Sequence, residues 1–382
     1  MKMAITADLH ANDSCYGIRD KDSGLLVKTA DALKALDFFI EKGLEAQADR
    51  FVVVGDIYDD HCPDSLVRRL VGERLQRLAI KEDKQVVLVA GNHDSCSLHH
   101  ALMPLQGWTR NLKIVDQQVV EKGEGYTAAY VPHTQDVERR KTTFAQLLAS
   151  LSLKGLQSPI ILFAHLAIRG AVMGDSTVST SVLAPTVSDL EQTGAEWAFL
   201  GDFHKHQQLP SSSMKAWYVG SLERYGMDQL EGSRGFFVFD TKTLKLDRIE
   251  YPGFRPMARW EATTVEEVMA KAESQDWDGH IVRIDFKGDD RQLVEMKASM
   301  ARVKSALTRR HGVHIFVEDA RPKEEQAARA ASSLRDGAID LLSILRPHVE
   351  RELVMEPDEV PLHMAILEDA HKKVKEEDSK WN

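Results

Sequence analysis

Five short segments of this chain carry carboxylate, imidazole and amide side chains, the groups that bind hard or borderline divalent metal ions. In chain order they are Asp8-Leu9-His10, Gly55-Asp56-Ile57-Tyr58-Asp59, Gly91-Asn92-His93-Asp94, an isolated His165 and Gly201-Asp202-Phe203-His204. Taken singly, each segment is more typical of a structural turn or a core position. In this order, and each after an apolar run, they predict a site for two metal ions, the arrangement that suits phosphoester hydrolysis.

Two ions held side by side need a bridging carboxylate, and Asp56, between a strand and a turn, is the predicted bridge. The other predicted ligands are Asp8, His10 and His204 for the first ion, and Asn92, His165 and Asp202 for the second. His93 directly follows a predicted ligand, so its imidazole is predicted to protonate the leaving oxygen or to stabilise the transition state. Asp59 is predicted to orient that imidazole, and Asp94 to accept backbone hydrogen bonds in its loop.

The remaining histidines of this region have no spacing that requires a ligand role. We expect them at the surface or lining a pocket; they are His61, His99, His100, His133 and His206. One alternative stays open, because His204-Lys205-His206 could also supply two ligands, although the turn at Gly201 favours Asp202 with His204.

Buried strands are predicted directly before the ligand segments. The apolar runs are Met3 to Thr6, Phe51 to Val54, Val86 to Ala90, Ile160 to Ala164 and Ala198 to Leu200. Apolar residues at helical spacing between 33 and 44, and again between 66 and 78, predict helices between the first three strands. This alternation predicts a layered α/β fold in which the ligands gather at the carboxyl ends of the strands.

The chain is predicted to form three regions: a domain over 1–255, which contains the ligand segments, a small α+β domain over 256–322 and a helical region over 323–382. Residues 217–251 read as further strands of the first domain, and the segment 252–256, with two prolines and a glycine, is the predicted boundary. The second domain is predicted to contain a helix over 264–272, a strand over 280–286, a helix over 293–310 and a strand over 313–317. The last helices either pack on the parent domain or dock onto helices of a partner, and the spacing favours neither.

Composition limits the classes of function. The formal net charge of -10 argues against tight nucleic-acid binding through the global field of the chain, so any DNA binding must be local or shared. No apolar run approaches the ~18 residues of a membrane span, and Asp8 interrupts the first one, so we expect a cytoplasmic protein, or one of the host cytoplasm if phage-encoded. Cys15, Cys62 and Cys96 lack the spacing of a disulfide framework or zinc site, and we expect small buried residues in tight loops.

The five segments resemble the motifs of the calcineurin-like metallophosphoesterase superfamily, from Asp8 through His204. Further features are similar to the SbcD-type nuclease subunits, bacterial and phage relatives of the Mre nuclease. They are Gly55-Asp56-Ile57-Tyr58-Asp59, His165-Leu166 followed by Gly170-Ala171, and Gly220-Ser221-Leu222-Glu223-Arg224 with Gly235-Phe236 beyond it, together with the small second module and helical tail.

The resemblance implies a four-layer metallophosphoesterase β-sandwich flanked by helices, with a small α+β capping domain and a helical tail. It also implies a two-manganese exonuclease and endonuclease, with Mg²⁺ possible, that acts on double-strand DNA ends and single-stranded DNA in repair or recombination. The implied partners are an SMC-like coiled-coil ATPase, held by the C-terminal helices, and a second copy of the chain. The family usually has histidine where this chain has Asp202, and the added carboxylate should favour manganese or magnesium over zinc.

Two other classes of function are compatible with the same segments. A protein phosphatase or cyclic-nucleotide phosphodiesterase shares the chemistry, but it would leave the chain beyond residue 256 unexplained. A non-catalytic scaffold typically loses the catalytic histidine or several ligands, whereas His93 and seven candidate ligands are present here.

Overall fold

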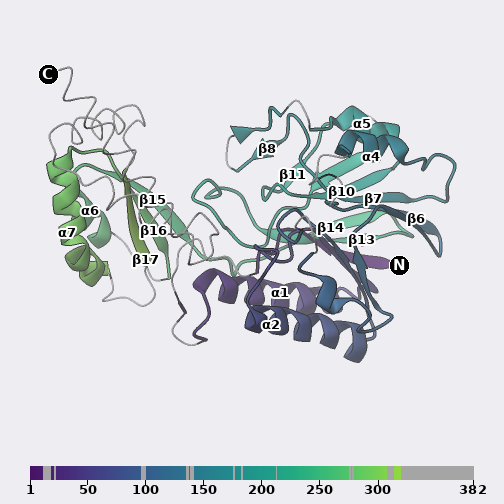
Figure 1. The fold of residues 1–382 in the computed structure, drawn as a ribbon, viewed down its shortest axis with the longest axis horizontal. Helices are drawn as coiled ribbons and strands as arrows, with labels where there is room; N and C mark the ends of the chain where they lie inside the picture. Colours follow the sequence, from purple (N-terminus) through teal and green to yellow (C-terminus); the bar gives the residue numbers. More distant parts are fainter. Residues whose placement is uncertain are drawn as a thin grey trace, which may run out of the picture. The chain divides into compact units, whose positions relative to one another are not determined.

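The structure is a computed structural model (Figure 1). It describes residues 1–11, 19–20, 23–95, 100–134, 137, 142–174, 177–181, 184–211, 213–274, 277, 279–307 and 314–319. The chain divides into two compact units, the first of which holds two six-stranded sheets. The predicted domain boundaries after residues 255 and 322 stay predictions, and the predicted helical region over 323–382 lies outside the described residues.

The first six-stranded sheet has the order β14-β13-β1-β2-β3-β4. Its strands are β1 (Lys2–Thr6), β2 (Arg50–Val54), β3 (Gln85–Val89), β4 (Leu112–Val115), β13 (Gly235–Asp240) and β14 (Lys245–Glu250). Strands β1 to β4 run parallel, and β13 pairs antiparallel with β1. The predicted strands before the first three ligand segments are therefore confirmed.

Two helices connect the parallel strands of this sheet, as the apolar spacing predicts. Helix α1 (Val27–Glu45) joins β1 to β2, and α2 (Ser65–Gln76), continued by a π-helical turn (Arg77–Lys81), joins β2 to β3. Both helices bury one apolar face against the sheet, where Leu36 and Phe39 of α1 and Leu75 of α2 belong to the same core cluster as Phe51 and Leu88.

The second six-stranded sheet has the order β11-β12-β10-β7-β6-β5. Its strands are β5 (Val119–Gly123), β6 (Tyr126–Val131), β7 (Ile160–His165), β10 (Trp197–Gly201), β11 (Gln207–Gln208) and β12 (Lys215–Tyr218). Strands β6, β7, β10 and β12 run parallel, whereas the edge strands β5 and β11 pair antiparallel. A two-stranded hairpin, β8 (Val172–Met173) and β9 (Thr177–Val178), lies outside this sheet.

The two sheets pack face to face, and helices cover their outer faces. One apolar cluster contains Ile5 and Val52 from the first sheet together with Phe163 and Phe199 from the second. Helices α4 (Phe144–Ser150) and α5 (Val187–Gln192) lie over the second sheet, on the side away from α1 and α2 (Figure 1). The fold is thus an α/β arrangement of two mixed sheets flanked by helices, as predicted.

An ionic cluster joins the two sheets where β2 begins. Arg50 Nη2 lies 2.6 Å from Glu121 Oε1 on β5, and its Nη1 donates to the Tyr130 hydroxyl on β6 at 3.1 Å. Lys113 on β4 approaches the other oxygen of Glu121 at 2.9 Å. Glu121 therefore accepts two cations from the first sheet while lying in the second.

A separate three-stranded sheet has the order β15-β16-β17, with strands β15 (Met257–Ala262), β16 (Ile281–Phe286) and β17 (His314–Asp319). Its helices are α6 (Val265–Glu273) and α7 (Asp290–Leu307). The predicted strands and helices of this region are confirmed, and Thr264 caps α6 by accepting a hydrogen bond from the Glu267 amide at 3.3 Å.

The structure also bears on two expectations from the sequence, the absence of a membrane span and the burial of the cysteines. No helix among the described residues is both long enough and apolar enough to cross a bilayer. Cys62 is exposed, so its expected burial is wrong: it lies in the loop before α2, where its amide donates to the Asp60 carboxylate at 2.7 Å in an exposed turn. Cys15 and Cys96 lie outside the described residues.

Candidate metal centre

The five predicted ligand segments converge at the carboxyl ends of the parallel strands of both sheets. Asp8 and His10 follow β1, Asp56 follows β2 and Asn92 follows β3, while His165 ends β7 and the segment 202–204 follows β10. Three overlapping groups bring their ligand atoms within 4.8 Å of one another: Asp8, His10 and His204; His10, Asp56 and His93; and Asp8, Asp56 and His165. Side chains from five segments thus form one cluster, in which His93 is exposed, His204 is partly buried and the others are buried.

The backbone at several of these positions adopts the left-handed region that non-glycine residues rarely occupy. The φ angles are +53° at Asp8, +43° at His10, +46° at Asp56 and +96° at Asp202. Backbone hydrogen bonds hold the first two segments together, with Leu9 N donating to Asp56 O at 2.8 Å and His10 N at 2.9 Å. Strain of this kind costs about 1–3 kcal/mol per residue and gathers at functional sites.

Asp56 lies between the other members of the cluster. Its Oδ2 is 3.6 Å from His10 Nε2 and 3.4 Å from His165 Nε2, and its Oδ1 accepts a hydrogen bond from the His93 amide at 3.0 Å. Glycine at position 91 makes this possible, because a Cβ atom there would overlap the carboxylate of Asp56. Asp56, the predicted bridge, therefore lies close to predicted ligands of both ions.

The predicted ligands of the first ion face one another closely. His10 Nε2 and His204 Nε2 are 2.9 Å apart, and the Gln229 side-chain amide lies 2.9 Å from the other ring nitrogen of His204. Asp8 is fully buried; its Oδ1 accepts from the Asp202 amide at 3.0 Å, whereas its Oδ2 has no hydrogen-bond partner among the described residues. An unsatisfied buried carboxylate oxygen beside two facing imidazoles fits a cation.

The predicted ligands of the second ion are also together. His165 Nε2 lies 2.8 Å from Asn92 Oδ1 and 3.9 Å from Asp202 Oδ1. The other ring nitrogen, Nδ1, lies 3.1 Å from the Val54 carbonyl oxygen, which can only accept, so Nδ1 donates to that oxygen and Nε2 faces the cluster. Glycine at position 55 leaves room for this ring, since a Cβ atom there would overlap it.

Asp59 contacts two histidines in different ways. Its carboxylate Oδ1 is 2.9 Å from His10 Nδ1 but 3.8 Å from His93 Nδ1, while its backbone carbonyl accepts from His93 Nδ1 at 2.9 Å. The carboxylate is therefore placed to orient the ring of His10, and the predicted partnership with His93 runs through the backbone instead. The His93 side chain is 43% exposed, so it lies at the open side of the cluster.

Asp94 has the structural role that the sequence predicts. Its carboxylate accepts backbone hydrogen bonds from Tyr58 at 2.9 Å, Gly91 at 2.9 Å and Ile57 at 3.2 Å. These bonds tie the third ligand segment to the second. Burial, and then the charge of Asp56, raises the pKa of Asp94 to about 6.

The protonation of the metal-free cluster follows from burial and from its mixture of carboxylates and imidazoles. Burial raises the pKa of Asp8 to about 7. Burial alone would lower the pKa of His10, but the hydrogen bond to Asp59 and the charge of Asp56 raise it to about 9. The pKa of His165 likewise rises to about 10 against the effect of burial, chiefly through Asp56. Without an ion, these two imidazoles are therefore protonated, and their charge balances that of the neighbouring carboxylates.

Sequence reasoning missed three residues that support the cluster. The Tyr225 ring lies 4.9 Å from that of His10 and 5.6 Å from that of His204, and its hydroxyl donates to the Leu9 carbonyl. Gln229 contacts His204 as described above, and Arg234 donates to the His204 carbonyl at 2.8 Å. Their only signal in the sequence is that they follow the segment Gly220-Ser221-Leu222-Glu223-Arg224.

The other histidines of this region differ in their surroundings. His61 is half exposed, His100 is buried against Asp116, and His133 and His100 line pockets, as expected; His99 lies outside the described residues. His206 bonds the Val219 carbonyl at 3.3 Å and belongs to none of the three groups above, so the alternative ligand pair is not supported.

The chain is similar in sequence to one known family and to a curated protein. Residues 1–206 match the family described as calcineurin-like phosphoesterase. The chain is 25% identical to the SbcD subunit of nuclease SbcCD from Staphylococcus epidermidis over an alignment of 281 residues, and the match covers 68% of this chain and 71% of that protein. Among solved structures it is similar to a dimetal phosphatase from Danio rerio, with 11% identity and a TM-score of 0.42, covering 66% of this chain and 99% of that one.

Proposed function

The chain belongs to the calcineurin-like phosphoesterase family, and from this premise we propose that it is a two-metal DNA nuclease that hydrolyses phosphodiester bonds at or near DNA ends. The convergence of acidic and imidazole side chains around Asp56 supports the hydrolytic chemistry. The similarity to the SbcD subunit of nuclease SbcCD supports DNA as the substrate and a role in DNA repair or recombination.

The donor set fits a pair of divalent cations, because it combines carboxylates, imidazoles and an amide oxygen with the unsatisfied Oδ2 of Asp8. The proposed ligands are Asp8, His10, Asp56, Asn92, His165, Asp202 and His204. When bound, such ions withdraw charge from the phosphate and make water a better nucleophile at neutral pH. Four of the seven ligands offer oxygen, which favours Mn²⁺ or Mg²⁺, and we propose Mn²⁺.

His93 is the proposed acid for the leaving oxygen. Its Nδ1 donates to the carbonyl of Asp59, which leaves Nε2 as the nitrogen that can give a proton to substrate at the open side of the cluster. Asp59 acts as a positioning residue, through its carbonyl on His93 and its carboxylate on His10. Asp56 also restrains the loop, since it accepts the His93 amide.

The test replaces this acid while preserving the cluster. We expect His93→Asn to reduce cleavage of linear DNA with Mn²⁺ by about 10²- to 10⁴-fold, the usual contribution of a general acid, with the metal content per chain unchanged. His61→Asn is the matched control, because His61 lies in the adjacent loop with half of its side chain exposed. Full activity of His93→Asn would remove this residue from the mechanism.

The same preparation distinguishes the competing activities. Linear double-stranded DNA, single-stranded DNA, a phosphopeptide and a cyclic nucleotide are compared at equal concentration with Mn²⁺. The proposal expects turnover of the DNA substrates; preferential turnover of the phosphopeptide or cyclic nucleotide would identify another phosphoesterase, and no turnover of any would identify a scaffold.

We also propose that residues 323–382 bind an SMC-like coiled-coil ATPase and that two copies of the chain act together. The distant similarity to a subunit of a nuclease complex supports this assembly, as does the net charge of -10, since a partner could contribute DNA-binding surface. Truncation before Ala327 should abolish co-purification with the ATPase and preserve metal binding. Co-purification at unchanged yield would contradict the docking role.

A further inference from the structure

A pocket of about 630 Å³ lies directly beside the second group of ligands. Asn92, His165 and Asp202 line one side of this apolar pocket, and apolar side chains, among them Phe144 and Leu166, line most of the rest. Phe144 is the first residue of α4, and Thr143 caps that helix by accepting a hydrogen bond from the Gln146 amide at 3.2 Å. The backbone that carries this aromatic side chain is thus held at a capped helix start.

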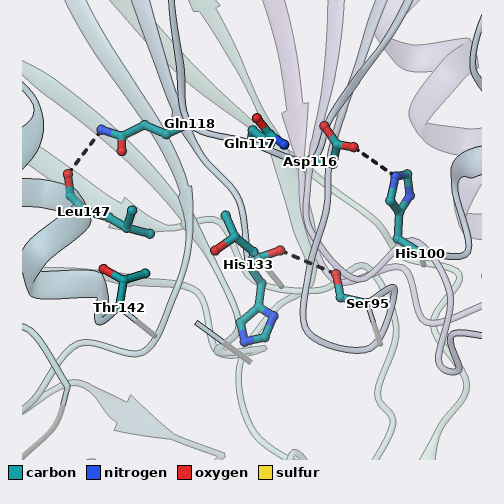
Figure 2. Close-up of a pocket in the computed structure, with 9 residues that line it drawn as sticks. Ser95, His100, Asp116, Gln117, Gln118, His133, Thr142 and Leu147 are labelled. Atoms are coloured by element: carbon teal, nitrogen blue, oxygen red, sulfur yellow. Dashed lines mark hydrogen bonds and ion pairs between the residues drawn. The ribbon is translucent and has the colours of Figure 1, made fainter. Parts of the chain in front are cut away.

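A second pocket, of about 490 Å³, has a different character (Figure 2). This polar pocket lies where the chain crosses from β4 in the first sheet to β5 in the second, and it is lined by Asp116, Gln117 and Gln118 from that crossing. His100 lines it as well, with Nε2 3.1 Å from Asp116 Oδ2. No lysine or arginine is among the described residues that line it.

The two pockets adjoin, because His133 and Thr142 line both of them. His133 follows β6, and its ring lies 5.7 Å from that of Phe144 at an interplanar angle of 53°. Moving away from the cluster, a ligand would therefore meet first the proposed metal ligands and then an apolar wall with an aromatic ring. Beyond these it would meet amide, hydroxyl and imidazole groups and the Asp116 carboxylate.

This order of surroundings matches the order of groups in a nucleotide. A phosphate suits the cluster, the face of a base suits an aromatic ring, and the polar edge of a base suits neutral hydrogen-bonding side chains. We infer that the two pockets together bind one nucleoside, the one esterified to the scissile phosphate, with its base against Phe144. The inference rests on the proposed nuclease function and adds its substrate form.

Two consequences separate this occupant from others. A base within a duplex is stacked and paired, so it must leave the helix to enter a pocket, and the preferred substrate is an unpaired or frayed nucleotide. A second phosphate group does not suit the polar pocket, because the Asp116 carboxylate lines it, with His100 as its partner, and no lysine or arginine does so among the described residues.

The test compares an oligothymidylate with an oligonucleotide of equal length whose sugars lack bases, with Mn²⁺. Stacking of a base on an aromatic side chain corresponds to about 5- to 150-fold in affinity, so we expect kcat/KM to be higher by such a factor for the oligothymidylate. Phe144→Leu keeps apolar volume against the second sheet but removes the aromatic face, and it should bring this ratio close to one. Phe144→Trp should retain the ratio.

The matched control is Trp108→Ala, which removes an exposed aromatic side chain that lines neither pocket. It should leave the ratio and both rates unchanged. An equal kcat/KM for the two oligonucleotides with the wild-type protein would overturn the nucleoside site while leaving the nuclease function intact, and so would an unchanged ratio in Phe144→Leu.

A binding measurement decides the inference without catalysis. The probe is 2-aminopurine deoxyribonucleoside 5′-monophosphate with Mg²⁺, whose fluorescence is quenched when the base stacks. We expect quenching by the wild-type protein and by Trp108→Ala, and weaker quenching by Phe144→Leu. If no DNA is cleaved, the proposed function fails and this measurement alone judges the pocket: quenching that depends on Phe144 supports it, and its absence overturns it.

Discussion

Gly55 and Gly155 form a pair of positions that differ mainly in what a side chain would meet. Their φ angles are +84° and +80°, so alanine at either position suffers nearly the same backbone strain, about 1–2 kcal/mol. A Cβ at residue 155 meets no atom within 4 Å among the described residues, whereas one at residue 55 overlaps the imidazole of His165. The difference between the two substitutions therefore reports on His165.

The ring of His165 has little freedom to move away. It is 1% exposed, and its two nitrogens lie 3.1 Å from the Val54 carbonyl and 2.8 Å from Asn92 Oδ1. Forcing extra volume into such a site costs about 1–3 kcal/mol beyond the backbone strain. We expect Gly55→Ala to lose about 2–5 kcal/mol of unfolding free energy in EDTA, and Gly155→Ala about 1–2 kcal/mol.

Metal binding should separate the two variants more sharply than stability does. Because a misplacement of about 1 Å in a catalytic site costs on the order of 10²-fold in rate, we expect Gly55→Ala to cleave DNA at about 1% of the wild-type rate and to lose the ion that His165 would hold. Gly155→Ala should keep the wild-type metal content and rate. Urea unfolding in EDTA, metal analysis after dialysis and DNA cleavage give the three quantities. If Gly55→Ala kept wild-type metal content and lost no more stability than Gly155→Ala, the assignment of His165 as a ligand would be refuted.

Three further predictions follow from the charges described above. The pKa values of His10 and His165 are raised to about 9 and about 10, so both rings are protonated at pH 7. Ion binding should therefore release about two protons and become tighter as the pH rises toward 9. Calorimetry in buffers of different ionisation enthalpy measures this proton release, and the absence of any release would contradict the ligand set. Glu121→Gln should lower the unfolding free energy by about 1–2 kcal/mol. Burial alone would raise the pKa of Glu121, but its cationic partners lower it, so the difference should disappear in acid, when Glu121 is protonated. Asp247→Asn, in an exposed ion pair, is the control and should leave the unfolding free energy unchanged. Asp202→His should shift the metal content after equal exposure to zinc and manganese toward zinc, and an unchanged partition would disprove the preference argued from this carboxylate.

The parts of the fold that the sequence predicts are those with a strong local signal. The run from Phe51 to Val54 is apolar throughout because β2 is covered on both faces, and the helices after β1 and β2 each bury one regular stripe. Strands β5 and β15 have no comparable signal. In β5 the residues alternate between partial burial and exposure at a sheet edge, and β15 follows directly after the prolines that indicate a boundary.

The same distinction holds within the candidate site. Ligand types and their order are local properties, so the sequence predicts which side chains gather beyond the strands. Asp59 approaches His10 rather than His93 because of the path of its loop and the backbone conformation of His10, which has a φ of +43°. Neither feature can be predicted from the spacing of these residues in the sequence. Tyr225 and Gln229 contact the cluster only because the chain returns to it after β12.

The candidate ligands belong to both sheets, with Asp8 and Asp56 on one side of the seam and His165 and Asp202 on the other. Ions bound there would link the two sheets at the end of β2, and the ion pair of Arg50 and Glu121 links them where β2 begins. Chelation would thus weaken one end of the interface, where the contacts of His165 with Val54 and of Asp202 with Asp8 would remain, and leave the other end unchanged. Amide hydrogen exchange along β2 would then be fastest near Val54 and slowest near Arg50. The exchange rates along this strand would therefore report whether the metal centre is occupied.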